Sequence, residues 1–309
     1  MSDKARIRVG SWANPLADRS RYFGLFILVA GSIAIWWGPL AANARLTLSS
    51  DAHTHILLIL PLSIALICFQ ARGAQLTFEP GRWPGLILLT AALVLRGCTA
   101  WDVWYPALGG RLSLSIIALV MWWIGSIILC LGLQAFRSFL FPLCFLFLIV
   151  PFPEHVLDWI TEFLQQQTAM AASALFHLAR VPVTRDGIML SIPGLDIEVA
   201  SECSSIRSSM MLLVTTMVLA HLFLRSWWRK ILLIVAVIPL SVAKNALRIF
   251  TITELGTRVD PGFLDGWLHH SGGIVFFGVA VLVIIMLLWL LRRPEDQTPI
   301  APWRGESTK

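Results

Sequence analysis

Glu202-Cys-Ser-Ser-Ile-Arg-Ser-Ser209 runs without a break into an apolar segment, 210–224, and together they form a predicted membrane span, 203–224. The thiol of Cys203 stands at the start of this span, and the guanidinium of Arg207 follows four residues later. If the segment is helical, both groups share one face. Charged groups at the mouth of an apolar span are costly and usually functional. We therefore treat this stretch as the centre of the protein.

The composition of the whole chain indicates an integral membrane protein. Of its 309 residues, 57% are hydrophobic and 14% are charged, whereas a soluble domain has about 45–50% apolar and about 25% charged residues. Spanning segments are expected to be helices, because helices satisfy their own backbone hydrogen bonds in lipid. Lys and Arg exceed Asp and Glu by 24 − 18 = 6. In a membrane protein such an excess sets the topology, so no nucleic-acid partner is expected.

The hydropathy pattern predicts an all-α membrane protein with about eight transmembrane helices. They cover roughly 22–42, 56–70, 83–98, 112–136, 139–152, 203–224, 231–252 and 268–292. We expect a basic cytoplasmic N-terminus over 1–21, a multi-spanning membrane domain over 22–293, and a disordered cytoplasmic tail over 294–309.

One extracytoplasmic segment, 153–202, interrupts the spans. Within it, apolar residues of 154–180 recur at helical spacing and acidic residues fill another face, which predicts an amphipathic helix that lies at the membrane interface or is partly re-entrant. Farther on, Arg185-Asp-Gly187 and Pro193-Gly194 are turn signals between short stretches rich in Val and Ile. They predict a small extracytoplasmic hairpin.

The distribution of Lys and Arg orients these spans. Loops assigned to the inside hold most of the basic residues, which places both termini inside. Cys203 then opens a span from the outer face, Arg248 lies near the outer end of 231–252, and His269 and His270 open the last span from outside. All of these groups are expected at one depth, near the outer face.

A thiol, an imidazole and a guanidinium at one place are the outline of nucleophilic acyl transfer. A thiol, whose pKa is normally about 8.5, becomes a good nucleophile when a helix N-terminus or a positive charge lowers that pKa. Histidine can move the proton, and arginine can stabilise the oxyanion. Taken singly, a boundary cysteine, an arginine that reaches the interface and a histidine beside glycines each have a structural explanation. Their shared depth favours a site.

Three segments in order resemble the signatures of the exosortase/archaeosortase family: Glu202-Cys-Ser-Ser-Ile-Arg-Ser208, Asn245-Ala-Leu-Arg-Ile249 and His269-His-Ser-Gly-Gly273. The resemblance covers about 195–277 and implies an eight-span cysteine transpeptidase of the type without an extra C-terminal domain. It implies catalytic roles for Cys203, Arg248 and His269. Ser205 stands where the family usually has glycine, and Glu202 directly abuts the cysteine. The histidine is doubled by His270, and the four-residue spacing to Gly273 favours His269.

The resemblance also implies a substrate. Family members process exported proteins whose C-terminal tail has a short Pro-containing motif, a transmembrane helix and a basic cluster. We expect cleavage at the outer (periplasmic) face of a bacterial inner membrane through a thioester, which an unknown acceptor nucleophile or water resolves. Membrane lipids are the other expected partners, and no cofactor or metal is implied.

Several further residues are expected to support the site: Glu202, Arg207, Lys244, Asn245, His270 and Gly273. Lys244 lies one helical turn before Arg248, where it either adds a second positive charge or pairs with Glu202 or Glu254. Asn245 is expected to brace Arg248 or the helix end.

Other readings stay open. Arg207, Lys244 and Arg248 could form the anion site of a transporter, although no inverted repeat is evident. Haem or metal binding through His269 and His270 lacks a second ligand pair. His53 and His55 have no carboxylate or thiol beside them and are expected in a solvated loop.

Overall fold

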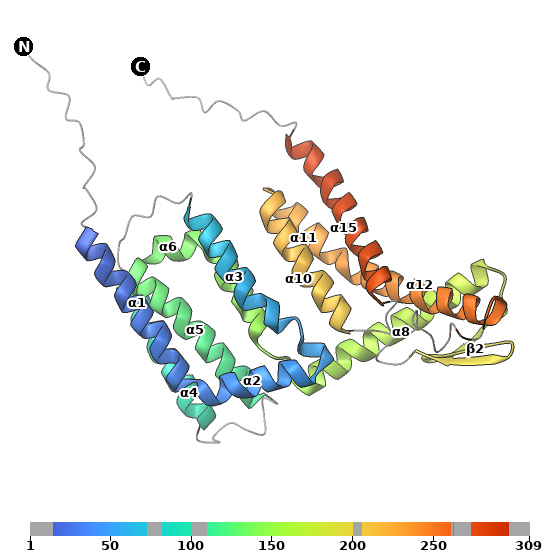
Figure 1. Ribbon diagram of the computed structural model, residues 1–309, viewed down its shortest axis with the longest axis horizontal. Helices are drawn as coiled ribbons and strands as arrows, with labels where there is room; N and C mark the ends of the chain where they lie inside the picture. The colour runs from blue at the N-terminus through green and yellow to red at the C-terminus, as the bar shows by residue number, and fades with distance from the viewer. Residues whose placement is uncertain are drawn as a thin grey trace, which may run out of the picture. The chain divides into compact units, whose positions relative to one another are not determined.

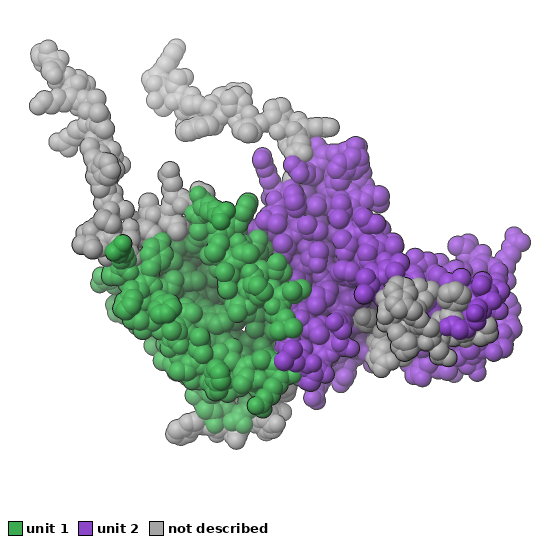
Figure 2. All heavy atoms as spheres, in the orientation of Figure 1, with its two compact units in different colours: residues 1–46, 56–152 green, residues 47–55, 153–309 purple. Residues whose placement is uncertain are grey.

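The computed structural model describes residues 15–72, 82–100, 110–199, 206–260, 262 and 273–296, and most of these are helical (Figure 1). Contacts divide the chain into two compact units, 1–46 with 56–152, and 47–55 with 153–309 (Figure 2). In the described part, six helices are long and apolar enough to cross a membrane, and two bent helix pairs raise the number to as many as eight. The predicted all-α membrane fold is therefore confirmed.

Unit 1 is a helical bundle around a core of aromatic and aliphatic side chains. Trp36, Leu119 and Trp122 are buried at its centre, and the indole Nε1 of Trp36 donates to the carbonyl of Ser115 at 2.9 Å. Its elements are α1 (Pro15–Ile35), α2 (Trp37–Ser49, whose last three residues belong to unit 2), α3 (Ile56–Ala71), α4 (Arg82–Ala100), α5 (Arg111–Leu131), α6 (Leu133–Ser138), α7 (Leu140–Phe145) and the 3-10 helix η2 (Leu146–Ile149).

Helices α4 and α5 touch at a glycine. A Cβ built on Gly85 would lie 2.8 Å from both the Cβ and the backbone nitrogen of Leu129. No rotation of a side chain relieves a contact with backbone, so only glycine permits this approach. Small residues at helix crossings are a common means of packing in membranes, where apolar side chains gain little by avoiding lipid.

The predicted span 22–42 is not one continuous helix, because the helix breaks at Trp36. The axes of α1 and α2 differ by 73°. The cause is Pro39, whose ring conflicts with the carbonyl four residues earlier, at Ile35, where α1 ends. Pro239 acts in the same way between α11 (Trp227–Val235) and α12 (Val237–Arg258). There the chain continues as one 32-residue candidate span.

The predicted span 139–152 is also shorter than expected. Its helical part, Leu140–Ile149, rises only about 16 Å, roughly half of the ~30 Å hydrocarbon core. The chain then passes Pro151 and Pro153, and α8 (Glu154–Leu178) begins in unit 2. Helix α8 matches the predicted amphipathic helix 154–180, and its position at the interface stays a prediction.

Unit 2 holds the sequence motifs and has two cores. Its other elements are the 3-10 helix η1 (Asp51–His53), strands β1 (Thr184–Asp186), β2 (Met189–Ile192) and β3 (Leu195–Glu198), and helices α10 (Ile206–Phe223), α11, α12 and α15 (Gly273–Asp296). One core joins α10, α11, α12 and α15, with Leu212, Leu233 and Ile284 buried. The other joins α8, the sheet and the later part of α12 (Figure 1). Helix α12 thus belongs to both.

The predicted hairpin is a three-stranded antiparallel sheet of order β1-β2-β3. Both of its turns occur at the predicted signals, between Asp186 and Met189 and between Ile192 and Leu195. Gly187 has φ 59° and Gly194 has φ 87°, backbone conformations that residues with a Cβ rarely adopt. The glycines therefore fix the two turns and the register between the strands.

Candidate active site

Lys244 links the helix that carries Arg248 to the helix that follows Cys203. Its Nζ donates to Oγ of Ser208, in the first turn of α10, at 2.6 Å and to Oδ1 of Asn245 at 2.7 Å. The Lys244 side chain is buried, with 6% of its surface exposed. Asn245 thus solvates the lysine, a role that the sequence did not indicate. The bond to Ser208 brings the first two signature motifs together.

Of the alternatives left open for Lys244, pairing with Glu254 does not occur, and Glu202 lies outside the described residues. Glu254 accepts a salt bridge from Nε of Arg258 at 2.8 Å, and ten residues of helix, about 15 Å of rise, separate it from Lys244. Among the described residues no carboxylate forms an ion pair with Lys244. Lys244 and Arg248 are therefore two cations one helical turn apart, with neutral oxygens around the lysine. Such a place attracts an anion or a developing negative charge.

Gly273 brings the third signature motif next to Arg248. A Cβ built on Gly273, the first residue of α15, would lie 3.8 Å from Nη1 of Arg248. The backbone of α15 therefore begins against the guanidinium. Because Gly273 has no side chain, the space beside Arg248 stays open, and a larger residue at position 273 would fill it.

Arg207 has an acidic partner that the sequence analysis missed. Its Nη1 lies 2.8 Å from Oδ1 of Asp51, and both side chains are largely exposed. Asp51 begins η1, which packs against α10. The ion pair offsets the Arg207 charge, so fewer unpaired cations face the site than the sequence suggested. Asp51 lies in the loop before the predicted span 56–70 and Arg207 at the outer end of the span 203–224, but no local pattern in the sequence pairs them.

The prediction of a solvated loop at His53 and His55 is wrong. Their exposed fractions are 3% and 1%. Nδ1 of His53 lies 3.1 Å from Oγ of Ser50, and Nδ1 of His55 donates to the carbonyl of Ala52 at 3.1 Å. The tight turn satisfies these ring nitrogens locally, and packing of η1 on α10 removes the turn from solvent.

Four predicted site residues lie outside the described residues: Glu202, Cys203, His269 and His270. What the structure shows is the flank of each motif. Helix α10 begins three residues after Cys203, and α15 begins four residues after His269. These flanks are connected by the bond from Lys244 to Ser208 and by the closeness of Gly273 to Arg248. The flanks of the three motifs thus lie close together, and the common depth of the motifs in the membrane stays a prediction.

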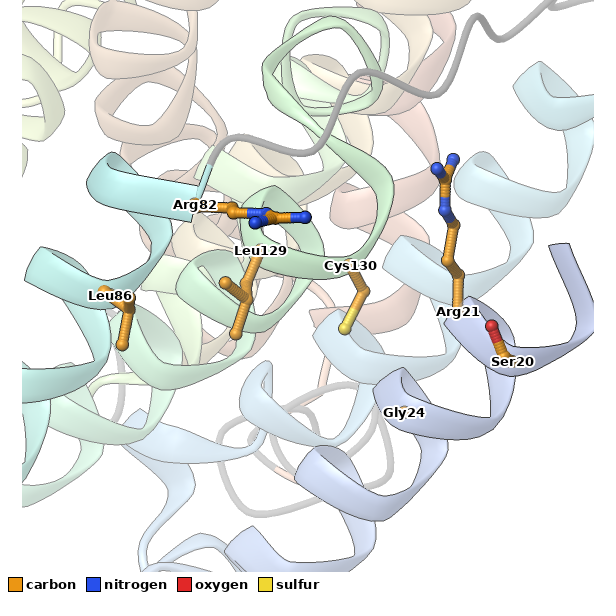
Figure 3. A pocket seen from close by; sticks show the side chains of 7 residues that line it. All are labelled: Ser20, Arg21, Gly24, Arg82, Leu86, Leu129 and Cys130. Atoms are coloured by element: carbon orange, nitrogen blue, oxygen red, sulfur yellow. The ribbon is translucent and has the colours of Figure 1, made fainter. Parts of the chain in front are cut away.

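A second place brings a thiol near arginines, in unit 1. Figure 3 shows a pocket in which Arg21 and Arg82 lie on either side of Cys130. Its remaining lining residues are Ser20, Gly24, Leu86 and Leu129. Among the residues that the structure describes, no histidine and no carboxylate lines this pocket, so none of them could accept the thiol proton. Cys130 therefore serves as an internal comparison for Cys203.

Comparison with known proteins agrees with the motifs. A family model described as a transmembrane exosortase (EpsH type) matches residues 47–286. The match covers most of the chain, includes every predicted site residue, and begins just before η1. No curated protein and no solved structure matches the chain.

Proposed function

Because this multi-pass membrane protein belongs to the exosortase family, a family with a transpeptidase- or protease-like role, we propose that it is a cysteine transpeptidase that cleaves C-terminal sorting tails of exported proteins. The substrate ends in a short Pro-containing motif, a transmembrane helix and a basic cluster. Cleavage occurs at the outer face of a bacterial inner membrane. The observation that carries the proposal is the pair of contacts, Lys244 to Ser208 and Arg248 to Gly273, that joins the three motifs.

In the proposed reaction, the Cys203 thiolate attacks the carbonyl carbon of the scissile peptide bond. His269 takes the thiol proton and later gives it to the leaving amine. Arg248 stabilises the oxyanion, aided by the charge of Lys244. The carbon–nitrogen bond breaks, the tail leaves as an amine, and the exported domain stays as a thioester on Cys203. An acceptor nucleophile or water then attacks the thioester and restores the thiol.

Chain length is compatible with these roles. Three residues separate Cys203 from the start of α10, and four separate His269 from the start of α15. Even a fully extended chain spans at most about 11 Å and about 14 Å over those lengths. Both side chains are therefore tethered near the ends that Lys244 and Arg248 bring together.

A second candidate function, a transporter or anion-binding membrane protein, is favoured by one observation. Lys244 is buried, and no carboxylate pairs with it among the described residues, as in a site that awaits an anion. The two functions differ in their need for the thiol. Cys203→Ala abolishes a transpeptidase and leaves an anion carrier working.

The test uses a secreted reporter fused to a tail of the predicted type, taken from an exported protein of the same cell. We expect wild type to shorten the reporter and Cys203→Ala to leave it intact, while Cys130→Ala, the matched thiol control, processes it normally. His269→Ala should abolish processing and His270→Ala should not. Processing by Cys203→Ala at the wild-type rate would refute the proposal. Activity in His269→Ala with none in His270→Ala would reassign the base.

A further inference from the structure

Among the described residues, no strand pairs with the outer edge of strand β3. The bond from the Val199 N–H to the Ile188 carbonyl, 3.0 Å long, together with the pairing of Leu190 with Ile197, fixes the alternation of the ladder. Residues at odd positions from 195 to 199 direct their backbone groups to β2. Asp196 and Glu198 direct their N–H and C=O groups away from it. Among the described residues, nothing bonds to these outward groups.

The opposite edge of the sheet, on β1, has fewer outward-facing backbone N–H and C=O groups. In β1, Thr184 and Asp186 face β2, because they pair with Ser191 and Met189 across a two-residue turn. Only Arg185 directs its backbone groups outward. A single residue is too short to hold a strand, whereas two alternate residues on β3 can bond three to four residues of an added strand.

Packing and a hydrogen bond hold strand β3 in place, and the predicted nucleophile follows the strand closely in the sequence. Val199, directly after β3, is fully buried, and its carbonyl accepts a bond from Nε2 of Gln165 of α8 at 3.0 Å. The inner face of the sheet packs in one core with Phe176 of α8 and Ile249 of α12, next to Arg248. The chain then reaches Cys203 four residues after Val199.

We propose that the exported protein binds to the β3 edge as an added strand. This inference rests on the proposed function. Main-chain bonds at a sheet edge bind extended peptides largely independently of their side chains. The tail on the C-terminal side of the scissile bond continues into the membrane, so the segment on the N-terminal side is the one that lies along β3. Because Cys203 follows β3 in the sequence, we expect this segment to pair parallel to it.

The length of the chain between β3 and Cys203 limits which substrate residues can pair with β3. Five residues from Glu198 to Cys203 span at most about 17 Å, so the paired residues lie within about eight residues before the scissile bond. In a parallel pair, every second substrate residue gives its N–H and C=O to β3. Proline at one of those alternate positions removes a donor and weakens binding.

Crosslinking tests this arrangement without requiring turnover. The enzyme carries Cys203→Ala, which keeps the reporter tail uncleaved, and Glu198→Cys. Single cysteines replace successive residues of the reporter before its transmembrane helix, and a short bismaleimide, which alkylates one thiol at each end, joins close pairs. We expect crosslinks at alternate reporter positions within about eight residues of the cleavage site, and none with Arg185→Cys, the control on the opposite edge. Equal yields at neighbouring positions, or with Arg185→Cys, would overturn the proposal.

A backbone change provides the functional test. Glu198→Pro removes only an outward N–H, because the groups that bond β2 belong to neighbouring residues, and Glu198→Ala controls for the carboxylate. We expect Glu198→Pro to lower processing at limiting substrate about three- to tenfold below Glu198→Ala, with Cys203 alkylation by a small maleimide unchanged. Equal processing by the two variants contradicts strand addition alone. Absence of Cys203-dependent processing in wild type would instead remove the proposed function, and this inference with it.

Discussion

The bond between Lys244 and Ser208 gives a quantitative prediction, because it is short, partly buried and involves a charged group. Nζ lies 2.6 Å from Oγ and only 6% of the lysine is exposed. Hydrogen bonds to charged groups contribute about 1.5–3 kcal/mol. We therefore expect the variants Lys244→Met and Ser208→Ala to be coupled by about 1.5–3 kcal/mol in the free energy of unfolding.

The coupling is the quantity to measure, because neither single variant is decisive. Replacing a buried charge by an apolar side chain of similar length is often neutral or even stabilising. Ser208 also has contacts besides Lys244, which its removal affects. A double-mutant cycle cancels these separate effects and leaves the pairwise energy.

The assay is reversible unfolding of the full chain in mixed detergent micelles, with wild type, both single variants and the double variant. Lys244→Met combined with Ser126→Ala is the control, since Ser126 bonds within its own helix in unit 1. That control pair should be additive. Additivity of Lys244→Met and Ser208→Ala within about 0.5 kcal/mol would show that the bond does not connect α10 and α12.

Other changes test the fold, the topology and the site. Gly85→Ala should lower the free energy of unfolding by about 1–3 kcal/mol, because its Cβ meets the Leu129 backbone, whereas Gly97→Ala on the same helix meets nothing within 4 Å and should not. Equal effects would refute the α4–α5 contact. A cysteine at Ser226 should react with an impermeant thiol reagent only after permeabilisation and one at Gly262 without it; the reverse would invert the predicted topology. Arg248→Lys keeps the charge but loses the planar fork, so reporter processing should fall severely with unchanged protein level in the membrane, and wild-type processing would exclude an oxyanion role for the guanidinium.

Much of the fold follows from local signals in the sequence. Apolar runs locate the spans, and glycines at 187 and 194 locate the turns of the sheet. The break at Trp36 was also readable, since Pro39 cannot continue a straight helix; hydropathy averages over such a residue and hides it. Residues 154–178 show helical periodicity strongly enough to outweigh their mixed polarity.

The contacts that build the site were not readable. Arg207 and Asp51 are 156 positions apart, and no local pattern indicates that they pair. The sequence offered Glu254 as a partner of Lys244, but the packing of α12 on α10 brings the Ser208 hydroxyl to the lysine, and the neighbouring Asn245 adds its amide oxygen. His53 and His55 look like residues of a polar loop, and only tertiary packing buries them. Local propensity gives way where long-range packing decides burial.

Detection of the proposed thioester on Cys203 tests the mechanism most directly. Wild-type enzyme is supplied with the reporter and a slow acceptor, and the membrane fraction is digested and analysed by mass spectrometry for an adduct on the peptide that contains Cys203. We expect the N-terminal fragment of the reporter attached to this cysteine, released by hydroxylamine at neutral pH and absent from Cys203→Ser. Processing of the reporter by Cys203→Ala at the wild-type rate would contradict the account.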